Sequence, residues 1–504
     1  MSASLALTIL IGLLGPSAMV PRLAGPSWQP PYSLDLAPGP HLVIALAAAA
    51  LVTGAAGLAA GLAALARGWA PDARRLLLVG CLTAVVLAFL PPSGSADHLN
   101  YAAYGRIAAL GLDPYVTVPD DLPADPVAGA VEEWRGTPSV YGPVATGVQA
   151  VASLLGGESV RLTVLVMQVV NAAAFIAVAV LLHRFAPPGG RARAALLWAA
   201  NPLVVYHLAA GMHVDTLAVA CVVAALVTGG SAGWTAASPY RLAGAGALLG
   251  LGVAVKINSG LAALGPAWAL RPWRPDRVPR GQAGDQAGGQ APRGRMPGRA
   301  LRGRAGGGLA VVAGVAFAVA GAAYLLAGPH ALDQVSQASE MVSLAVPWSL
   351  VKGWLQALFG PGGYRSWIRA GSLLLLVVLA WLLARALREP YRIDAGGESA
   401  PGMAVVVVAA WLVAAPYALP WYDGLLFALL ALVPATALDG FAVARLAVLS
   451  LGYLPARQAG RPPDLEWLVT VVRAGLVPWV LLGLTAVLLW WVCPAGRRAR
   501  VRRG

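Results

Sequence analysis

The segment from Ser95 to Arg106 places a carboxylate, two rings and a cation directly after the apolar run 76–90. Asp97 is the residue that could do chemistry there, because a carboxylate beside a hydroxyl can act as a general base. In a helix beginning near Ser95, the helical period puts Asp97 on one stripe with Tyr101 and Tyr104. The opposite stripe is apolar and holds Leu99, Ala103, Ile107 and Leu110.

This pattern predicts an amphipathic helix in the membrane interface, with its apolar stripe on lipid and Asp97 facing a cavity. Arg106 lies at the edge of the apolar stripe, where a long side chain can extend to the level of the headgroup phosphates. The alternative is that Asp97 only stabilises a helix N-terminus through the helix dipole. Spacing alone does not choose between these interpretations.

Two further polar segments lie between apolar runs. Residues 134–143 combine aromatic and cationic side chains in a turn-rich loop that includes Tyr141. Aromatic rings stack on sugar faces, and they also form ordinary interfacial belts. Residues 416–423 form a hairpin whose Trp421 and Tyr422 are either interface anchors or walls of a lipid-linked substrate groove. Arg365, in the long segment 328–367, is a further cation.

Asn201-Pro202 interrupts the short run 195–209, and His213 and Asp215 follow at the start of the next helix. Backbone carbonyls freed by such a break are tolerated in a membrane only inside protein or along a cavity. The His-x-Asp pair could bind a phosphate or orient a sugar, and the alternative is a helix cap. Lys256 ends another run, where it either extends to the interface or pairs with an anion.

The composition places all these segments in a membrane protein. The 504 residues are 58% hydrophobic and only 12% charged, whereas about 25% is usual in soluble domains. Because a span needs roughly 20 apolar residues, we predict an all-α, polytopic membrane domain of about 12 to 14 helices over residues 1–504. The clear runs are 41–66, 160–183, 213–230, 306–327, 368–386 and 468–493, and the shorter ones are 3–20, 76–90, 195–209, 242–258, 259–271, 402–416, 421–437 and 440–454.

Charge predicts the orientation of these helices. The net charge of +14 comes mainly from arginines in loops that one side of the membrane can collect, and that side is cytoplasmic by the positive-inside rule. The cytoplasmic side would hold a disordered basic loop, 272–305, and a basic tail, 494–504. Because the positive charge then serves membrane topology, it gives no reason to expect a nucleic-acid partner. Residues 91–158 then form an extracytoplasmic catalytic loop, in which we interpret 141–155 as a helix that lies on the surface or dips into the outer leaflet rather than as a span.

No metal site is predicted from the sequence. The three cysteines, Cys81, Cys221 and Cys493, lie in or beside apolar runs and form no ligand or disulfide framework. His213 and Asp215 alone do not make a metal site. We therefore expect no required cofactor, and the ligand count does not support a divalent metal.

The ordered set of these motifs resembles actinobacterial polyprenol-phosphate-mannose-dependent α-1,6-mannosyltransferases of the GT-C glycosyltransferase superfamily. The resemblance runs over residues 76 to 430, through Asp97-x-x-x-Tyr101-x-x-Tyr104, Tyr141-Gly142-Pro143, Asn201-Pro202-Leu203, His213-x-Asp215, Lys256 and Leu419-Pro420-Trp421-Tyr422. Two departures are visible. Met212 and Val214 replace a glycine and an asparagine of the family pattern, and Asp97-His98 replaces a more acidic start.

The resemblance implies a GT-C fold and a multi-pass protein of the cell membrane, with an active site on the extracytoplasmic face. It implies transfer of a hexose, mannose above all, from a polyprenyl-phosphate donor to a hydroxyl of a glycan or glycolipid, with inversion and an α-1,6 linkage, as in lipoglycan biosynthesis. Asp97 is the expected catalytic base. The cations expected at the donor phosphate are Arg106, His213, Lys256 and Arg365, and the expected groove residues are Tyr101, Tyr104, Tyr141, Asp215, Trp421 and Tyr422.

A transporter of lipids or sugars is the alternative, because cavities lined by broken helices also serve transport. Transporters often show two matching halves. No internal repeat is visible in this chain, and its polar groups gather on one face rather than at mid-depth.

Overall fold

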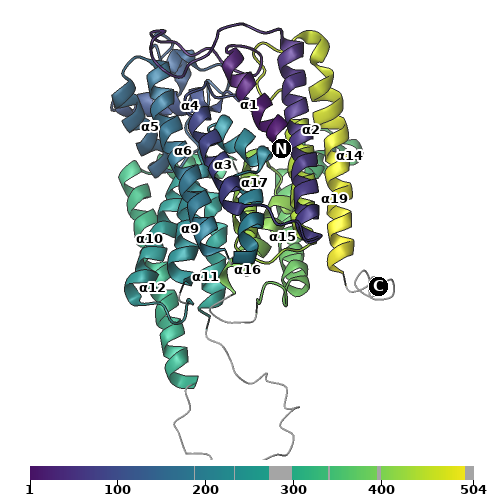
Figure 1. Cartoon of the computed structure of the whole chain (residues 1–504). Helices are drawn as coiled ribbons and strands as arrows, with labels where there is room; N and C mark the ends of the chain where they lie inside the picture. Colours follow the sequence, from purple (N-terminus) through teal and green to yellow (C-terminus); the bar gives the residue numbers. More distant parts are fainter. Residues whose placement is uncertain (187, 232, 272–297, 339–340, 394–398, 494–504) are drawn as a thin grey trace, which may run out of the picture.

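The computed structural model describes residues 1–186, 188–231, 233–271, 298–338, 341–393 and 399–493. These residues form helices and loops with no β-strand among them, and backbone pairing outside the helices includes one isolated bridge between Ser17 and Val20. The predicted all-α class is confirmed for this part of the chain. Figure 1 shows the helices gathered into one bundle.

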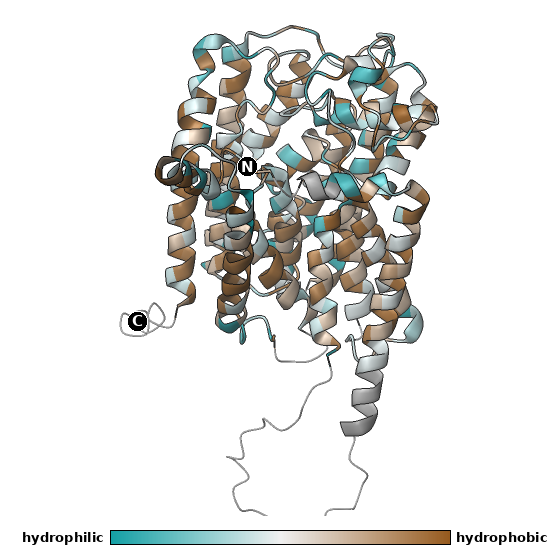
Figure 2. Ribbon diagram, turned by 180° about the vertical axis from the view of Figure 1, so that it is seen from behind, coloured by the Kyte–Doolittle hydropathy of each residue, from teal (hydrophilic) through white to brown (hydrophobic). Residues whose placement is uncertain are grey.

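Five helical stretches in the described ranges are long and apolar enough to cross a membrane. They are α2 (Pro40–Ala66), α6 (Val160–Phe185), residues Gly306–Ala327 of α12 (Gly298–Ala327), α15 (Arg365–Ala386) and the stretch Pro463–Val492, which ends in α19 (Val477–Val492). Apolar residues predominate along the long helices, and hydrophilic residues gather in the loops at the upper end of Figure 2. The predicted count of about 12 to 14 spans is not confirmed, because most of the other apolar helices are shorter than a bilayer requires.

Three of the predicted spans are broken into short pieces. The run 195–209 forms α7 (Arg191–Leu197), α8 (Pro202–Val204) and a π-helical turn (Val205–Ala210). The side chain of Asn201 caps α8 by accepting from the amides of Leu203 and Val204, so the predicted interruption is confirmed. The run 259–271 is a 3-10 helix (Ile257–Ala263) followed by α11 (Leu264–Ala269).

The run 421–437 is likewise not one continuous helix. It begins with a 3-10 turn (Pro420–Tyr422), continues as α17 (Asp423–Leu430) and ends in a loop that contains Pro434. Proline has no amide hydrogen and fits poorly inside a helix. The next helix is α18 (Ala437–Gly452).

Helix α4 (Asp97–Ala109) begins at Asp97, so the predicted helix exists, but its environment differs from the prediction. Three of the four residues of the stripe expected to lie on lipid are covered by protein: Leu99, Ala103 and Ile107 are at most 1% exposed, whereas Leu110 is 46% exposed. The neighbour is α5 (Pro143–Gly156), which approaches so closely that a Cβ at Gly105 would lie 2.2 Å from the carbonyl oxygen of Gln149. Glycine at position 105 therefore permits the contact between the two helices.

Helix α5 covers most of the predicted surface helix 141–155, whose position at the membrane surface stays a prediction. Pro143 stands in its first turn, and its 14 residues are fewer than the roughly 17 that a span requires. Ala145 and Ala152 are buried, whereas Val151, Leu154 and Leu155 are between 55% and 68% exposed. This two-sided pattern is typical of a helix with one face on protein and one on lipid.

The remaining longer helices complete the bundle. They are α1 (Ser2–Leu14), α3 (Ala73–Leu87), α9 (Asp215–Gly230), α10 (Pro239–Val255), α13 (His330–Ala338), α14 (Pro347–Phe359) and α16 (Ala400–Ala414). Helix α16 is buried along almost its whole length. Helices α4 and α5 lie at the upper end of the bundle in Figure 1, and α10 and α12 extend to the lower end.

Two predicted segments fall largely outside the described residues. Of the basic loop 272–305, residues 272–297 are not described, and the helix α12 already begins at Gly298. The loop is therefore shorter than predicted, because its last eight residues are helical. The predicted tail 494–504 lies wholly outside the described part.

Candidate active site

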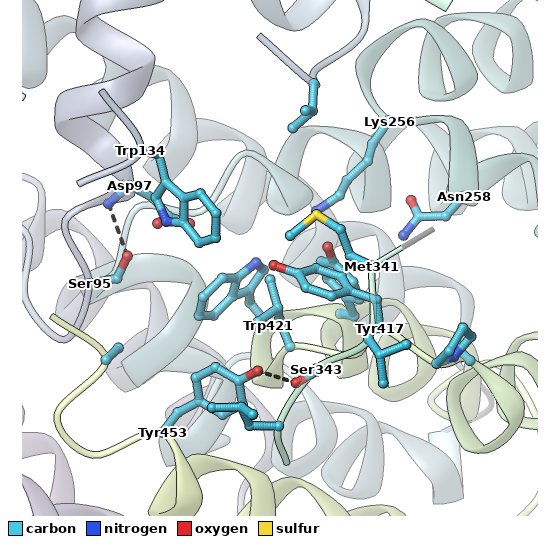
Figure 3. A pocket seen from close by; sticks show the side chains of 18 of the residues that line it. Ser95, Asp97, Trp134, Lys256, Asn258, Met341, Ser343, Tyr417, Trp421 and Tyr453 are labelled. Carbon is cyan, nitrogen blue, oxygen red and sulfur yellow. Dashed lines mark hydrogen bonds between the residues drawn. The ribbon is translucent and has the colours of Figure 1, made fainter. Parts of the chain in front are cut away.

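A cavity of about 690 Å³ opens beside the start of α4, and this size is usual for a ligand site. Its walls come from α4, the loop 133–141, residues 256–258, residues 341–344, one face of α15, the hairpin 414–422 and the segment 453–473. Figure 3 shows Asp97, Trp134, Lys256 and Trp421 around it. Segments from both halves of the chain therefore build one site.

Asp97 stands on the wall of this cavity, and its side chain is 23% exposed. Its backbone amide donates to the hydroxyl of Ser95 at 3.0 Å, which fixes the first turn of α4. Burial raises the pKa of the Asp97 carboxyl to about 6, against the opposing effects of the Ser95 hydroxyl and the Lys256 ammonium. A carboxylate with a pKa near neutrality is well matched to take a proton from a hydroxyl.

His213 faces Asp97 from behind the cavity wall. Its Nδ1 lies 3.5 Å from an oxygen of Asp97 and 3.4 Å from the hydroxyl of Tyr101. The imidazole stacks on Trp421 with 3.7 Å between ring centroids. Burial lowers the pKa of His213 well below its usual value, so the ring is neutral at pH 7. This position suits the orientation of Asp97 better than it suits the predicted contact with a phosphate.

Asp215 faces the other way and pairs with Lys256. The ammonium of Lys256 lies 2.7 Å from both oxygens of Asp215 and 4.1 Å above the ring of Tyr422. Lys256 lines the cavity with an extended backbone where α10 ends. The close approach of Gly142, where a Cβ would lie 2.2 Å from the carbonyl oxygen of Ala254, brings the Tyr141-Gly142-Pro143 motif against this end.

The predicted groove residues lie close together, but not all reach the cavity. Tyr104, Tyr141, Trp421 and Tyr422 line it, whereas Tyr101 is 2% exposed and sits against His213. Tyr141 joins the two α4 tyrosines, with ring centroids 4.9 Å from Tyr101 and 6.3 Å from Tyr104.

Neither of the two arginines predicted to bind the donor phosphate lines the cavity. Arg106 donates from Nε to Asp125 at 2.8 Å, and both side chains are largely buried. Asp125 also accepts from the amides of Val127 and Ala128, so Arg106 anchors a loop instead of extending to the headgroups. Arg365 begins α15 on a side that does not belong to the cavity lining.

The structure places two other cations on the cavity wall, Arg369 of α15 and Arg473. Arg473 donates to the carbonyl oxygens of Gly452 and Pro455, whereas Arg369 is exposed and makes no ion pair with any residue that the structure describes. Both lie within apolar runs, and an ionisable residue in such a run marks a candidate site. The same signal that singled out Lys256 would have found them.

Helix α15 contributes one face to the cavity, formed by Arg369, Ser372, Leu373 and Leu376. These residues follow the spacing of one helix face, which was a second signal in the sequence. No group of three or more His, Cys, Asp or Glu that could hold a metal occurs in the described ranges.

Comparison with known proteins gives a family match over residues 3–271, to the model described as alpha-(1->6)-mannopyranosyltransferase, N-terminal domain. An alpha-(1->6)-mannopyranosyltransferase of Mycobacterium tuberculosis is 34% identical over 136 residues, 26% of this chain and 23% of that protein. The alpha-(1->6)-mannopyranosyltransferase A of Corynebacterium glutamicum is 27% identical over 180 residues, 35% of each chain. The chain thus spans about a quarter to a third of the length of these relatives. No solved structure matches it.

Proposed function

The chain belongs to the alpha-(1->6)-mannopyranosyltransferase family, whose model matches more than half of its length, and from this premise we propose that it is a membrane mannosyltransferase. Its donor is a polyprenyl-phosphate-mannose, and its acceptor is a hydroxyl of an extracytoplasmic glycan or glycolipid. The new bond is α-1,6. The observation that carries the proposal is Asp97, a carboxylate with a pKa of about 6 on the wall of a large cavity, inside the matched region.

The transfer is a single displacement with inversion. Asp97 takes the proton of the acceptor hydroxyl while the acceptor oxygen forms a bond to the anomeric carbon of mannose. The bond between that carbon and the phosphate oxygen breaks, and its electron pair leaves with the polyprenyl phosphate. His213 orients the base, because its Nδ1 lies 3.5 Å from a carboxylate oxygen of Asp97. Tyr101 supports His213, because its hydroxyl lies 3.4 Å from the same nitrogen.

The leaving phosphate gains negative charge, so cations on the cavity wall stabilise the transition state. Lys256 and Arg369 are the cations whose positions support this role. Arg369 takes the place in the proposal that Arg365 held in the sequence-based prediction. Arg106, paired with Asp125, takes no part in the reaction.

The apolar side of the cavity supports a lipid-linked donor. Leu373 and Leu376 follow Arg369 on the same face of α15, and most of α15 is not buried inside the protein. A polyprenyl chain lying along this helix would place its phosphate at Arg369. The extracytoplasmic position of the site rests on the positive-inside rule.

The proposal is tested with purified protein in vesicles, radiolabelled polyprenyl-phosphate-mannose and a synthetic α-mannoside acceptor. We expect label in the acceptor with the lipid-linked donor and none with a nucleotide-linked mannose. Transfer from the nucleotide-linked sugar, or no consumption of the lipid-linked donor with any acceptor tried, would contradict the proposal. Release of intact donor on the other side of the vesicle would indicate a transporter.

Exchanging Arg369 for glutamine is expected to raise the KM for the lipid-linked donor roughly 10- to 100-fold, because a charge-assisted hydrogen bond to phosphate contributes about 1.5–3 kcal/mol. The matched control is Arg365→Gln, one turn earlier on α15 and outside the cavity lining. Steady-state kinetics with varied donor measure both. An equal effect in the two variants, or none in Arg369→Gln, would refute the role of Arg369.

The pH profile should report Asp97. Only the ionised carboxylate accepts a proton, so kcat/KM is expected to fall tenfold per pH unit below about 6, where the raised pKa of Asp97 lies. At pH values above about 6, where the Asp97 carboxylate is ionised, kcat/KM should no longer rise with pH. A rate that stays constant down to pH 4.5 would mean that the base has an ordinary carboxyl pKa or is a different group.

A further inference from the structure

Trp134 has a backbone conformation that a tryptophan rarely adopts. Its φ is +60°, in the left-handed region, which bulky residues enter only when the surrounding structure holds them there. Such strain is typical of functional positions. Residue 134 belongs to the loop that lines the cavity together with the start of α4.

Helix α4 holds this loop on both sides of Trp134. The side-chain amide of Asn100 donates to the carbonyl oxygen of Glu133 at 2.9 Å. The hydroxyl of Tyr104 donates to the backbone carbonyl oxygen of Thr137 at 3.0 Å. The amide of Thr137 donates in turn to the carbonyl oxygen of Trp134. Because the same helix carries Asp97, these contacts fix the backbone around Trp134 relative to the proposed base.

The side chain of Trp134 is only partly buried. It is 53% exposed, lines the cavity and is drawn with Asp97 among the lining side chains in Figure 3. An ordinary interfacial tryptophan needs neither a left-handed backbone nor a place in a cavity. Trp28, which is 74% exposed and does not line the cavity, is an example.

We infer that Trp134 is the stacking platform for the acceptor saccharide and thereby selects a hexose as the acceptor. This inference rests on the proposed function. The indole face binds the C–H face of the sugar ring and presents one hydroxyl to Asp97. The acceptor is assigned to this wall because Asp97 must touch the acceptor oxygen, whereas Arg369 and the apolar residues of α15 form a different wall.

The experiment compares Trp134→Ala, Trp134→Phe and Trp134→Gly with wild type in the vesicle assay. We expect the acceptor KM to rise about tenfold or more in Trp134→Ala and Trp134→Gly, with the donor KM unchanged. Trp134→Phe retains an aromatic face and should stay within about threefold of wild type. Trp28→Ala is the matched control and should leave both KM values unchanged.

Thermal unfolding separates this role from a structural one. Glycine adopts the left-handed region without strain, so Trp134→Gly should unfold at the same temperature as wild type or higher while binding acceptor poorly. A clear fall in its unfolding temperature, with no recovery of the acceptor KM in Trp134→Phe, would assign Trp134 to packing and overturn the inference.

Binding without turnover gives an independent measurement. Saturation-transfer NMR should detect the α-mannoside on the Asp97→Asn protein and lose it on Asp97→Asn/Trp134→Ala. If wild type transfers no mannose, the proposed function fails. If wild type is active and Trp134→Ala has a normal acceptor KM and normal mannoside binding, only the stacking role fails.

Discussion

Asp97→Asn is expected to lower kcat by roughly 10²- to 10⁴-fold, the usual contribution of a general base. The amide has the shape of the carboxylate but does not accept the acceptor proton. The hydrogen bond from the Asp97 backbone amide to the Ser95 hydroxyl does not involve the Asp97 carboxylate. Helix α4 should therefore begin at the same residue in the variant. Donor binding should therefore persist, and single-turnover transfer from radiolabelled donor measures the chemical step directly.

The control for this variant is Asp113→Asn. Asp113 lies in the same segment, 91–158, but does not line the cavity. Asp113 accepts from the amide of Tyr115, and an asparagine oxygen preserves that contact. Activity close to wild type is expected. An Asp97→Asn protein that binds donor and transfers mannose at the wild-type rate would exclude Asp97 as the base.

Several residues of the site were predictable from the sequence because a membrane protein leaves few polar residues at the ends of its apolar runs. Asp97, Tyr141 and Lys256 stand out for that reason, and the structure brings them to one cavity. Their roles remain predictions. The helix break at Asn201 was likewise visible in advance, because Asn-Pro is a recognised N-terminal signal.

The partners of these residues were not predictable from spacing. His213 and Asp215 are two residues apart, yet the first faces Asp97 and the second faces Lys256, after a left-handed turn at Met212. Arg106 is engaged by Asp125, nineteen residues along the chain, through a loop whose path no local pattern specifies. The number of spans is not settled by hydropathy, because burial in protein and burial in lipid favour the same side chains.

Lys256 allows a decisive test because it has two potential roles, one toward the leaving phosphate and one toward Asp215. Lys256→Met should lower kcat roughly 10²- to 10³-fold, as for loss of a group that stabilises transition-state charge. It should also destabilise the fold, because Asp215 is left as a buried, unpaired carboxylate. A low rate in this variant alone would therefore be ambiguous.

The double variant Lys256→Met/Asp215→Asn resolves the ambiguity. It removes both charges, so its unfolding temperature in detergent should return toward the wild-type value while transfer stays as low as in Lys256→Met. Asp215→Asn alone keeps the ammonium at the cavity and should retain much more activity than either. Recovery of transfer in the double variant would show instead that Lys256 serves only to neutralise Asp215, and the phosphate would then depend on Arg369 and Arg473, the other cations on the wall.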